Sequence, residues 1–395
     1  MTSSNPVVID PASTHGARIA QSLIGIGFLF IGVVLTSLVA YLLYVTGGEF
    51  YEGAFENHPI ASLVLFIIMV VLVGLVSLSL IAVGVLLLMH HMRAAHIVAE
   101  VSIFLLFGCA LCELMLEGIK PLFIVFCVAG ILLVAMFTSM DPALSEERRL
   151  QRKLRDMQTR EEALDGTLGR DETGRGYIAL NFFNLFWIFT IGALVGDVVE
   201  TFYHYMIEVP GEFQIRAGLL WGPFSPIYGF GAVILTILLN RFYKANIVVV
   251  FFVSAVVGGA FEYFVSWFLE YAFGAVAWDY TGRFLNIGGR TDFMFMCMWG
   301  VLGVIWIKLL LPKVLELVNK IPWQWRYSLT TVCAILMIIN GAMTLIALDC
   351  WYSRLAGMPS DDLAVSQFFA THFDDAYMEA RFQSMSIHPD LTTRI

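Results

Sequence analysis

Charged residues are scarce in this sequence. Asp, Glu, Lys and Arg together make up 14% of its 395 residues, whereas a soluble globular domain carries about a quarter. Hydrophobic residues make up 59% of the chain. Most of the chain must therefore lie in a solvent that does not reward charge, which excludes an ordinary soluble domain.

Basic residues are also in the minority. The 23 Lys and Arg residues are outnumbered by 32 Asp and Glu residues, and the net charge is -9. A nucleic-acid partner requires a basic surface, so we expect none. The six cysteines lack the spacing of metal ligands, and the pair Cys109 and Cys112 lies within an apolar stretch, where a thiol behaves as a small hydrophobe. We therefore expect no metal and no cofactor.

The sequence contains no G-x-x-x-x-G-K-[ST] motif, so the chain carries no P-loop ATPase of its own. A nucleophile–base motif is also missing. We therefore do not expect this chain to be an enzyme.

Long apolar stretches dominate what is present. About nine of them approach the length that crosses the hydrocarbon core of a bilayer. We therefore expect an all-α polytopic integral membrane protein. The sixth stretch is short and follows Pro223, so it is a candidate for a re-entrant helix. The stretches are Ile19–Val45, Ile60–Met89, Ile97–Leu116, Pro121–Thr138, Ile178–Met206, Pro226–Asn240, Ile247–Phe273, Phe293–Leu311 and Tyr327–Leu348.

A charged segment, residues 141–177, divides the chain. It contains SEERRLQRKLRDMQTREEAL, and pairs such as Asp156 and Arg160 at i,i+4 favour an exposed helix. We expect a cytoplasmic helical linker, either a solvated helix or a docking surface for a partner. It separates an N-terminal four-helix membrane module from a five-helix membrane module. The modules comprise residues 1–140 and 178–348, and an extracytoplasmic tail covers residues 349–395.

The distribution of Lys and Arg among the loops predicts a cytoplasmic N-terminus and an extracytoplasmic C-terminus. This topology places Lys120, Arg216, Arg283 and Arg290 outside, against the usual bias. Basic residues held on that side favour a functional interpretation.

Acidic residues within apolar stretches are the strongest functional signal, because each costs several kcal/mol unless it is paired or hydrated. Glu200 and Glu262 both lie in such stretches. Asp197 and His204 share a helical face with Glu200.

The two acidic stretches also resemble each other. The motif G-x-x-x-E-x-F occurs at residues 196–202 and again at 258–264. Each occurrence is followed by a loop with an arginine, Arg216 or Arg290, and by a return helix. This pattern predicts a tandem repeat with a pseudo-two-fold axis along the membrane normal, and transporters often place their site between such repeats.

We therefore predict a polar cavity near the outer leaflet, in which Glu200 and Glu262 face Arg216 and Arg290. The alternative is that these charges form structural ion pairs that tie loops to helices. The predicted substrate-binding residues are Glu200, Arg216, Glu262, Asp279, Asn286 and Arg290.

The second half of the chain contains several distinctive sequence blocks. They are GDVVETFY (196–203), RAGLLWGPFSPIYGFGA (216–232), FEYFVSWFLE (261–270), WDYTGRFLNIGGR (278–290), Trp299-Gly300 and DDAYMEARF (374–382). In this order the blocks resemble the bacterial membrane proteins of the ABC-transporter permease family of the CmpB type, over about residues 178–385. Members usually have an aromatic residue where this chain has Gly196-Asp197, and residues 1–140 have no counterpart.

The resemblance implies a permease subunit of a transporter in the bacterial cell membrane, with a separate ATPase subunit on the cytoplasmic side. Two alternatives remain open. The chain could be a membrane-embedded enzyme that acts on a lipid-linked substrate, or a non-catalytic membrane scaffold or sensor.

Overall fold

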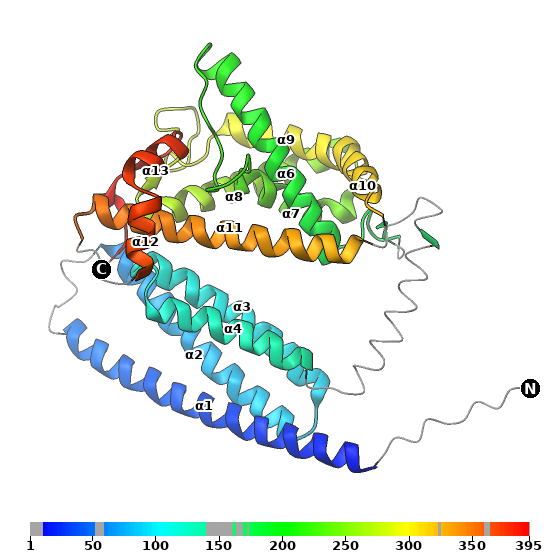
Figure 1. Ribbon diagram of the computed structural model, residues 1–395, viewed down its shortest axis with the longest axis vertical. Coiled ribbons are helices and arrows are strands. Elements are labelled where there is room, and N and C mark those ends of the chain that lie inside the picture. The colour runs from blue at the N-terminus through cyan, green and yellow to red at the C-terminus, as the bar shows by residue number, and fades with distance from the viewer. Residues whose placement is uncertain are drawn as a thin grey trace, which may run out of the picture. The chain divides into compact units, whose positions relative to one another are not determined.

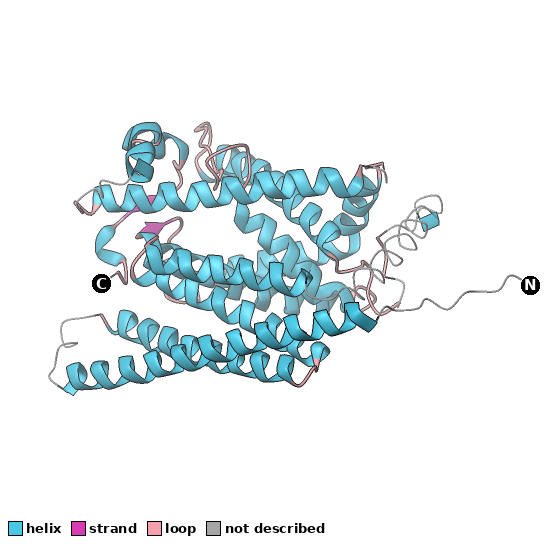
Figure 2. Cartoon of the chain, turned by 60° about the horizontal axis from the view of Figure 1, so that its bottom comes forward, coloured by secondary structure: helices cyan, strands magenta, loops and turns pink. Residues whose placement is uncertain are grey.

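The chain folds into two units made almost entirely of helices. In the computed structural model, the described residues are 11–51, 59–139, 161–162, 169–171, 174–322, 325–358 and 364–394. One unit comprises residues 1–153 with 393–395, and the other comprises 154–392. Figure 2 shows the helices together with one pair of short strands. Most of the predicted linker, 141–177, lies outside the described residues.

The first unit consists of consecutive helices that pack against their neighbours in the sequence (Figure 1). They are α1 (Pro11–Tyr51), α2 (Ile60–Leu88), α3 (Met92–Leu116) and α4 (Pro121–Ser139).

The core of this unit is narrow and its outer surface is apolar. Phe28, Leu87 and Leu133 are buried between the helices. Large side chains also point outward, and Phe30 and Phe104 are 68% and 76% exposed. An apolar surface of this extent would promote aggregation in water. It suits a helix bundle surrounded by lipid.

The second unit alternates long apolar helices with shorter elements. In chain order these are α6 (Phe182–Tyr203), η1 (His204–Glu208), α7 (Pro226–Leu239), η2 (Asn240–Phe242), α8 (Ile247–Phe273), β1 (Ala275–Val276), α9 (Phe293–Ile305), η3 (Trp306–Leu310), α10 (Leu311–Asn319), α11 (Arg326–Leu355), α12 (Ala364–His372), α13 (Asp375–Arg381), β2 (Ser386–Ile387) and η4 (Pro389–Leu391).

The starts of three of these helices follow from capping side chains. Asn181, Asn246 and Asp292 precede α6, α8 and α9, and each accepts a hydrogen bond from a backbone N–H of the first turn, at 2.9, 2.9 and 2.8 Å. Such caps satisfy N–H groups that have no partner within the helix. These capping side chains therefore fix the residues at which α6, α8 and α9 begin.

The helix that starts at Phe293 is longer than the sequence predicts. The eighth stretch was expected to end at Leu311, but the apolar helical span continues to Asn319. A π-helical turn, η3, precedes Pro312, which lacks the N–H that a continuous α-helix would use. Leu315 and Val318 beyond the proline are buried, so an amphipathic helix continues the span.

Seven helices among the described residues are long and apolar enough to cross a membrane. The fourth and sixth predicted stretches correspond to shorter apolar helices, Pro121–Met136 and Pro226–Phe242. Both exist as helices, and whether they span the bilayer stays a prediction, as does the orientation of the termini.

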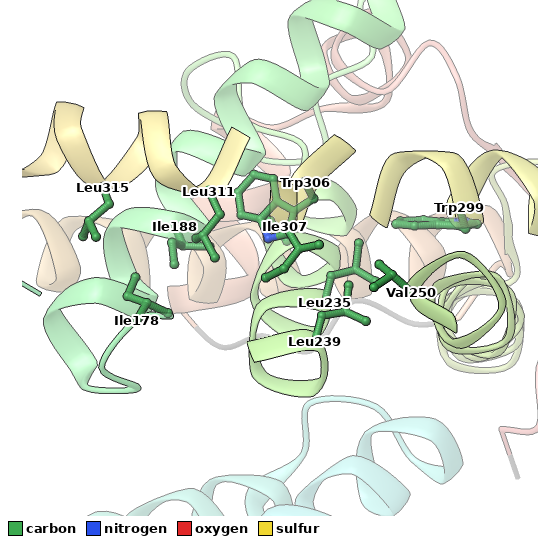
Figure 3. Packing of buried hydrophobic residues seen from close by; sticks show 11 residues of the cluster. Ile178, Ile188, Leu235, Leu239, Val250, Trp299, Trp306, Ile307, Leu311 and Leu315 are labelled. Atoms are coloured by element: carbon green, nitrogen blue, oxygen red, sulfur yellow. The ribbon is translucent and has the colours of Figure 1, made fainter. Parts of the chain in front are cut away.

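The core of the second unit joins α6, α7, α8 and the helix from Phe293 to Asn319. Figure 3 shows its side chains, which include Leu235, Leu239, Trp306 and Leu311. The Trp306 Nε1 atom donates to Thr236 Oγ1 at 2.9 Å, and both residues are buried. The indole therefore fills apolar space without leaving its N–H unpaired.

The C-terminal segment folds back onto the second unit. This segment forms two helices, α12 and α13, because Asp374 caps a new helix by accepting from Tyr377 N at 2.8 Å. Strand β2 then pairs antiparallel with β1, which follows α8. Gly274 at this junction has φ of +60°, and a Cβ there would overlap the His388 backbone, so glycine is required.

Candidate functional site

Glu200 and Arg216 lie together at the C-terminal end of α6. The Arg216 Nη1 atom is 3.7 Å from Glu200 Oε1, and Arg216 Nη2 donates to Glu208 Oε2 at 2.8 Å. The Arg216 side chain is 12% exposed. One predicted pair is therefore present, and Glu208 is an additional partner that the sequence analysis did not include.

Glu262 is held by neutral hydroxyl groups. It is 5% exposed, and its carboxylate accepts from the Tyr280 hydroxyl at 3.0 Å and from Thr291 Oγ1 at 2.8 Å. Both donors come from the segment between α8 and α9. None of the ion pairs among the described residues includes Glu262.

Burial and the neighbouring Glu262 raise the pKa of the Tyr280 hydroxyl well above its usual range. The hydroxyl therefore keeps its proton and remains available as a donor to the carboxylate.

Arg290 pairs with Glu270 rather than with Glu262. Its Nη2 atom donates to Glu270 Oε1 at 2.8 Å, and Nη1 donates to Glu270 Oε2. The rings of Tyr263 and Tyr271 flank the guanidinium at 5.9 and 5.5 Å from their centroids. Glu270 lies two turns beyond Glu262, nearer to the helix end where the loop returns. The prediction that Arg290 faces Glu262 is therefore wrong.

Burial alone would lower the pKa of the Arg290 guanidinium, but the hydrogen bonds and charge of Glu270 raise that pKa overall. The Arg290 guanidinium therefore stays charged at neutral pH.

Asp279 and Asn286 organise the loop between α8 and α9. Asp279 is exposed and accepts from Thr281 N and Thr281 Oγ1 at 2.8 and 2.6 Å, which lowers the pKa of its carboxyl. Asn286 donates to Arg283 O at 2.9 Å and accepts from Gly289 N at 3.1 Å. Their described hydrogen bonds therefore stay within the loop, and contact with a substrate stays a prediction for both.

Aromatic side chains of the two return helices, α7 and α9, lie near the carboxylates of Glu200 and Glu262. Tyr228 of α7 interacts with both Glu200 and Glu262, and Trp299 of α9 interacts with Glu262. Tyr228 is therefore within electrostatic range of carboxylates on two different helices. The sequence signal for this role was an aromatic residue followed by glycine, which occurs at 228–229 and at 299–300.

The helix contacts repeat in the two halves. A Cβ added at Gly196 of α6 would overlap Tyr228, and one added at Gly258 of α8 would overlap Trp299. Each glycine lies four residues before its glutamate, Glu200 or Glu262. Each helix pair therefore packs an aromatic ring of the return helix onto the glycine of the acidic helix.

The reverse contact repeats as well. A Cβ at Gly229 would lie 2.8 Å from Phe189 Cδ2, and one at Gly300 would lie 2.6 Å from Phe251 Cε2. Phe189 and Phe251 each lie seven residues before the glycine of the acidic motif. The return helices thus pack on the acidic helices through equivalent positions in both halves.

The ion pairs follow the same pattern. Glu208 and Glu270 each lie eight residues after the motif glutamate, and they bind Arg216 and Arg290 respectively. The tandem similarity seen in the sequence therefore extends to the packing and to the charges.

The irregular backbone before α7 is satisfied by side chains from α11 and α13. Asn340 accepts from Trp221 N at 3.2 Å and donates to Trp221 O at 2.8 Å, and Thr344 accepts from Leu220 N at 3.0 Å. Arg381 donates to Leu219 O and to Gly222 O. Non-helical backbone is tolerated at membrane depth only when protein or water satisfies it.

Comparison with known families identifies this region. Residues 187–345 match the model of one family, which is described as "Putative ABC-transporter type IV". This segment matches the CmpB-type family, which the sequence blocks resemble. The CmpB-type segment contains both acidic motifs and both return helices, whereas the block at 374–382 lies beyond it. No curated protein and no solved structure matches the chain. This match and the helices long enough to cross a membrane fit a multi-spanning membrane protein of the transporter type.

Proposed function

We propose that this chain is the membrane-spanning permease subunit of a transporter and that the cluster of Glu200, Tyr228 and Glu262 is its substrate site. The observation that carries the proposal is the repeated architecture of the CmpB-type segment. Each of two apolar helices contributes one motif glutamate to the cluster, and Tyr228 interacts electrostatically with both glutamates. Transporters with internal repeats commonly bind their substrate where the repeats meet.

The chemistry of the cluster favours a substrate that brings a positive charge or several hydrogen-bond donors. Glu262 is surrounded by hydroxyl groups that both donate and accept. These groups can reorient when a substrate replaces one of them at the carboxylate. Glu200 has one arginine at 3.7 Å, which is shared with Glu208.

The chain has no ATPase motif, so we assign ATP hydrolysis to a separate subunit on the cytoplasmic side. In the proposed orientation, the N-terminus and the charged segment 141–177 lie on that side of the bacterial cell membrane. The polar cluster then lies near the extracytoplasmic face.

The partner is tested by purifying the tagged full chain from its native membrane in mild detergent. We expect mass spectrometry to identify one ATPase subunit in near-stoichiometric amount and the purified complex to hydrolyse ATP. A scaffold would instead copurify with proteins that have no ATPase activity. A folded chain that never copurifies with an ATPase would rule out the ABC-type assignment.

A further inference from the structure

A cavity of about 530 Å³ opens beside α6. Its walls come from α6 and η1, from Phe213, residues 215–217 and residues 222–223 of the following loop, and from Arg381 of α13. Arg216, which lies beside Glu200, contributes to its lining, whereas Tyr228 does not. The carboxylates of Glu200 and Glu262 are not among the lining residues.

Two buried polar atoms of lining residues have no hydrogen-bond partner in the part of the chain that the structure describes. Asp197 is 6% exposed, and its Oδ1 atom accepts no hydrogen bond from the described residues. The Arg216 Nε atom is likewise buried, and it donates to none of them. Buried polar groups are almost always paired. An orphaned acceptor and an orphaned donor on one cavity therefore point to a ligand that supplies both partners.

The charges around Asp197 and Arg216 narrow the class of that ligand. Arg381 is the cation that interacts electrostatically with Asp197, but its Nε and Nη2 atoms donate to the carbonyls of Leu219 and Gly222. Arg216 directs Nη1 and Nη2 toward Glu200 and Glu208, which leaves Nε for another acceptor. A suitable ligand offers N–H donors to Asp197 and an anionic oxygen to Arg216.

The rim of the cavity is apolar and faces outward. Phe202 and Phe213 are 60% and 69% exposed, and Tyr205 is 43% exposed. Phe202 belongs to a helix that is long and apolar enough to cross a membrane. Acyl chains would cover these rings in a bilayer, whereas a small water-soluble zwitterion would leave them uncovered.

We propose that this cavity binds a phospholipid with a primary ammonium headgroup, whose ammonium donates to Asp197 and whose phosphate accepts from Arg216. The ammonium supplies three N–H donors, and the phosphate supplies acceptor oxygens. This binding does not depend on the transport proposal, because it is measured on the chain alone.

The test uses the purified full chain in detergent, titrated with phosphatidylethanolamine and followed by native mass spectrometry. We expect phosphatidylethanolamine to bind about tenfold more tightly than phosphatidylcholine, whose trimethylated nitrogen cannot donate a hydrogen bond. This comparison uses only the wild-type protein, so its result does not depend on whether a variant folds. Equal affinity for the two lipids would overturn the proposal.

The variant Asp197→Asn keeps the size of the side chain and removes its charge. We expect it to lower phosphatidylethanolamine affinity about tenfold. The matched control is Asp390→Asn, which removes an exposed carboxylate outside the cavity and should leave the affinity unchanged. Equal affinities of the two variants would contradict the assignment of Asp197.

Free phosphoethanolamine distinguishes the lipid from a soluble zwitterion, because it carries the same headgroup without acyl chains. We expect millimolar concentrations to displace the lipid poorly. Displacement at the same concentration as the lipid would show that the acyl chains contribute nothing, which would overturn the lipid assignment.

Discussion

Replacing Arg290 by alanine is expected to destabilise the second unit by about 3–5 kcal/mol. The change removes the arginine partner of Glu270 and leaves a largely buried carboxylate without its ion pair. The two side chains are 12% and 20% exposed, and Glu270 accepts two hydrogen bonds from the guanidinium. The variant also loses the contacts with the rings of Tyr263 and Tyr271. The measurement is unfolding of the purified full chain in detergent.

A double-mutant cycle separates the ion pair from general damage. Glu270→Ala should also be destabilising, and the double variant should lose less stability than the sum of the two single changes. The control is Lys120→Ala in the first unit, whose pair with Glu117 is more exposed, at 58% and 36%, and should contribute about 0.2–1 kcal/mol. Additive effects of Arg290→Ala and Glu270→Ala would show that the pair does not form.

Replacing Gly258 by alanine is expected to cost at least about 1–3 kcal/mol, the usual effect of overpacking a dense interface. An added Cβ would overlap Trp299 at its Cβ and Cγ atoms. These atoms cannot move without shifting α9 or the indole ring. Because Trp299 also interacts with Glu262, the same change should disturb the proposed substrate site.

The matched control is Gly341→Ala on α11. Among the described residues, no heavy atom outside the helix lies within 4 Å of a Cβ added there. Alanine is also the better helix former by about 1 kcal/mol. We therefore expect no loss of stability in the control, measured by thermal unfolding in the same detergent. If the Gly258→Ala and Gly341→Ala variants had equal thermal stabilities, the close packing of α8 on α9 would be refuted.

Hydropathy was sufficient to locate the helices, because each apolar stretch corresponds to a helix in the structure. It was not sufficient to find where they end. Beyond Leu311 the helix becomes amphipathic, with Leu315 buried and Glu316 exposed, so the average apolar character falls while the helix continues. The helices Pro121–Met136 and Pro226–Phe242 show a second limit of hydropathy. An apolar stretch predicts a helix, but it does not by itself establish that the helix spans a membrane.

The acidic residues of the candidate site were predictable, because a carboxylate in an apolar helix is rare and stands out. Their partners were less so. The sequence predicted that both glutamates face both arginines in one cavity, but Arg290 binds Glu270 instead. Arg290 pairs with Glu270 because of where the loop between α8 and α9 packs back against α8. The spacing of residues in the sequence does not show this position.

The neutral partners were missed for a different reason. Tyr280 and Thr291, which bind Glu262, are common residue types that carry no charge signal. The equivalence of Tyr228 and Trp299 also depends on helix packing, since the glycines that receive them lie more than thirty residues earlier in the chain.

The central claim is that Glu200 and Glu262 form a transport site. The most direct test reconstitutes the purified complex into vesicles, supplies ATP and a mixture of small solutes from cells, and measures the vesicle contents by mass spectrometry. We expect at least one solute to accumulate with ATP, and to fall about tenfold or more in Glu200→Gln and Glu262→Gln. The exposed control Glu379→Gln should retain accumulation. Equal solute accumulation by the wild type, Glu200→Gln and Glu262→Gln would contradict a transport site at these two carboxylates.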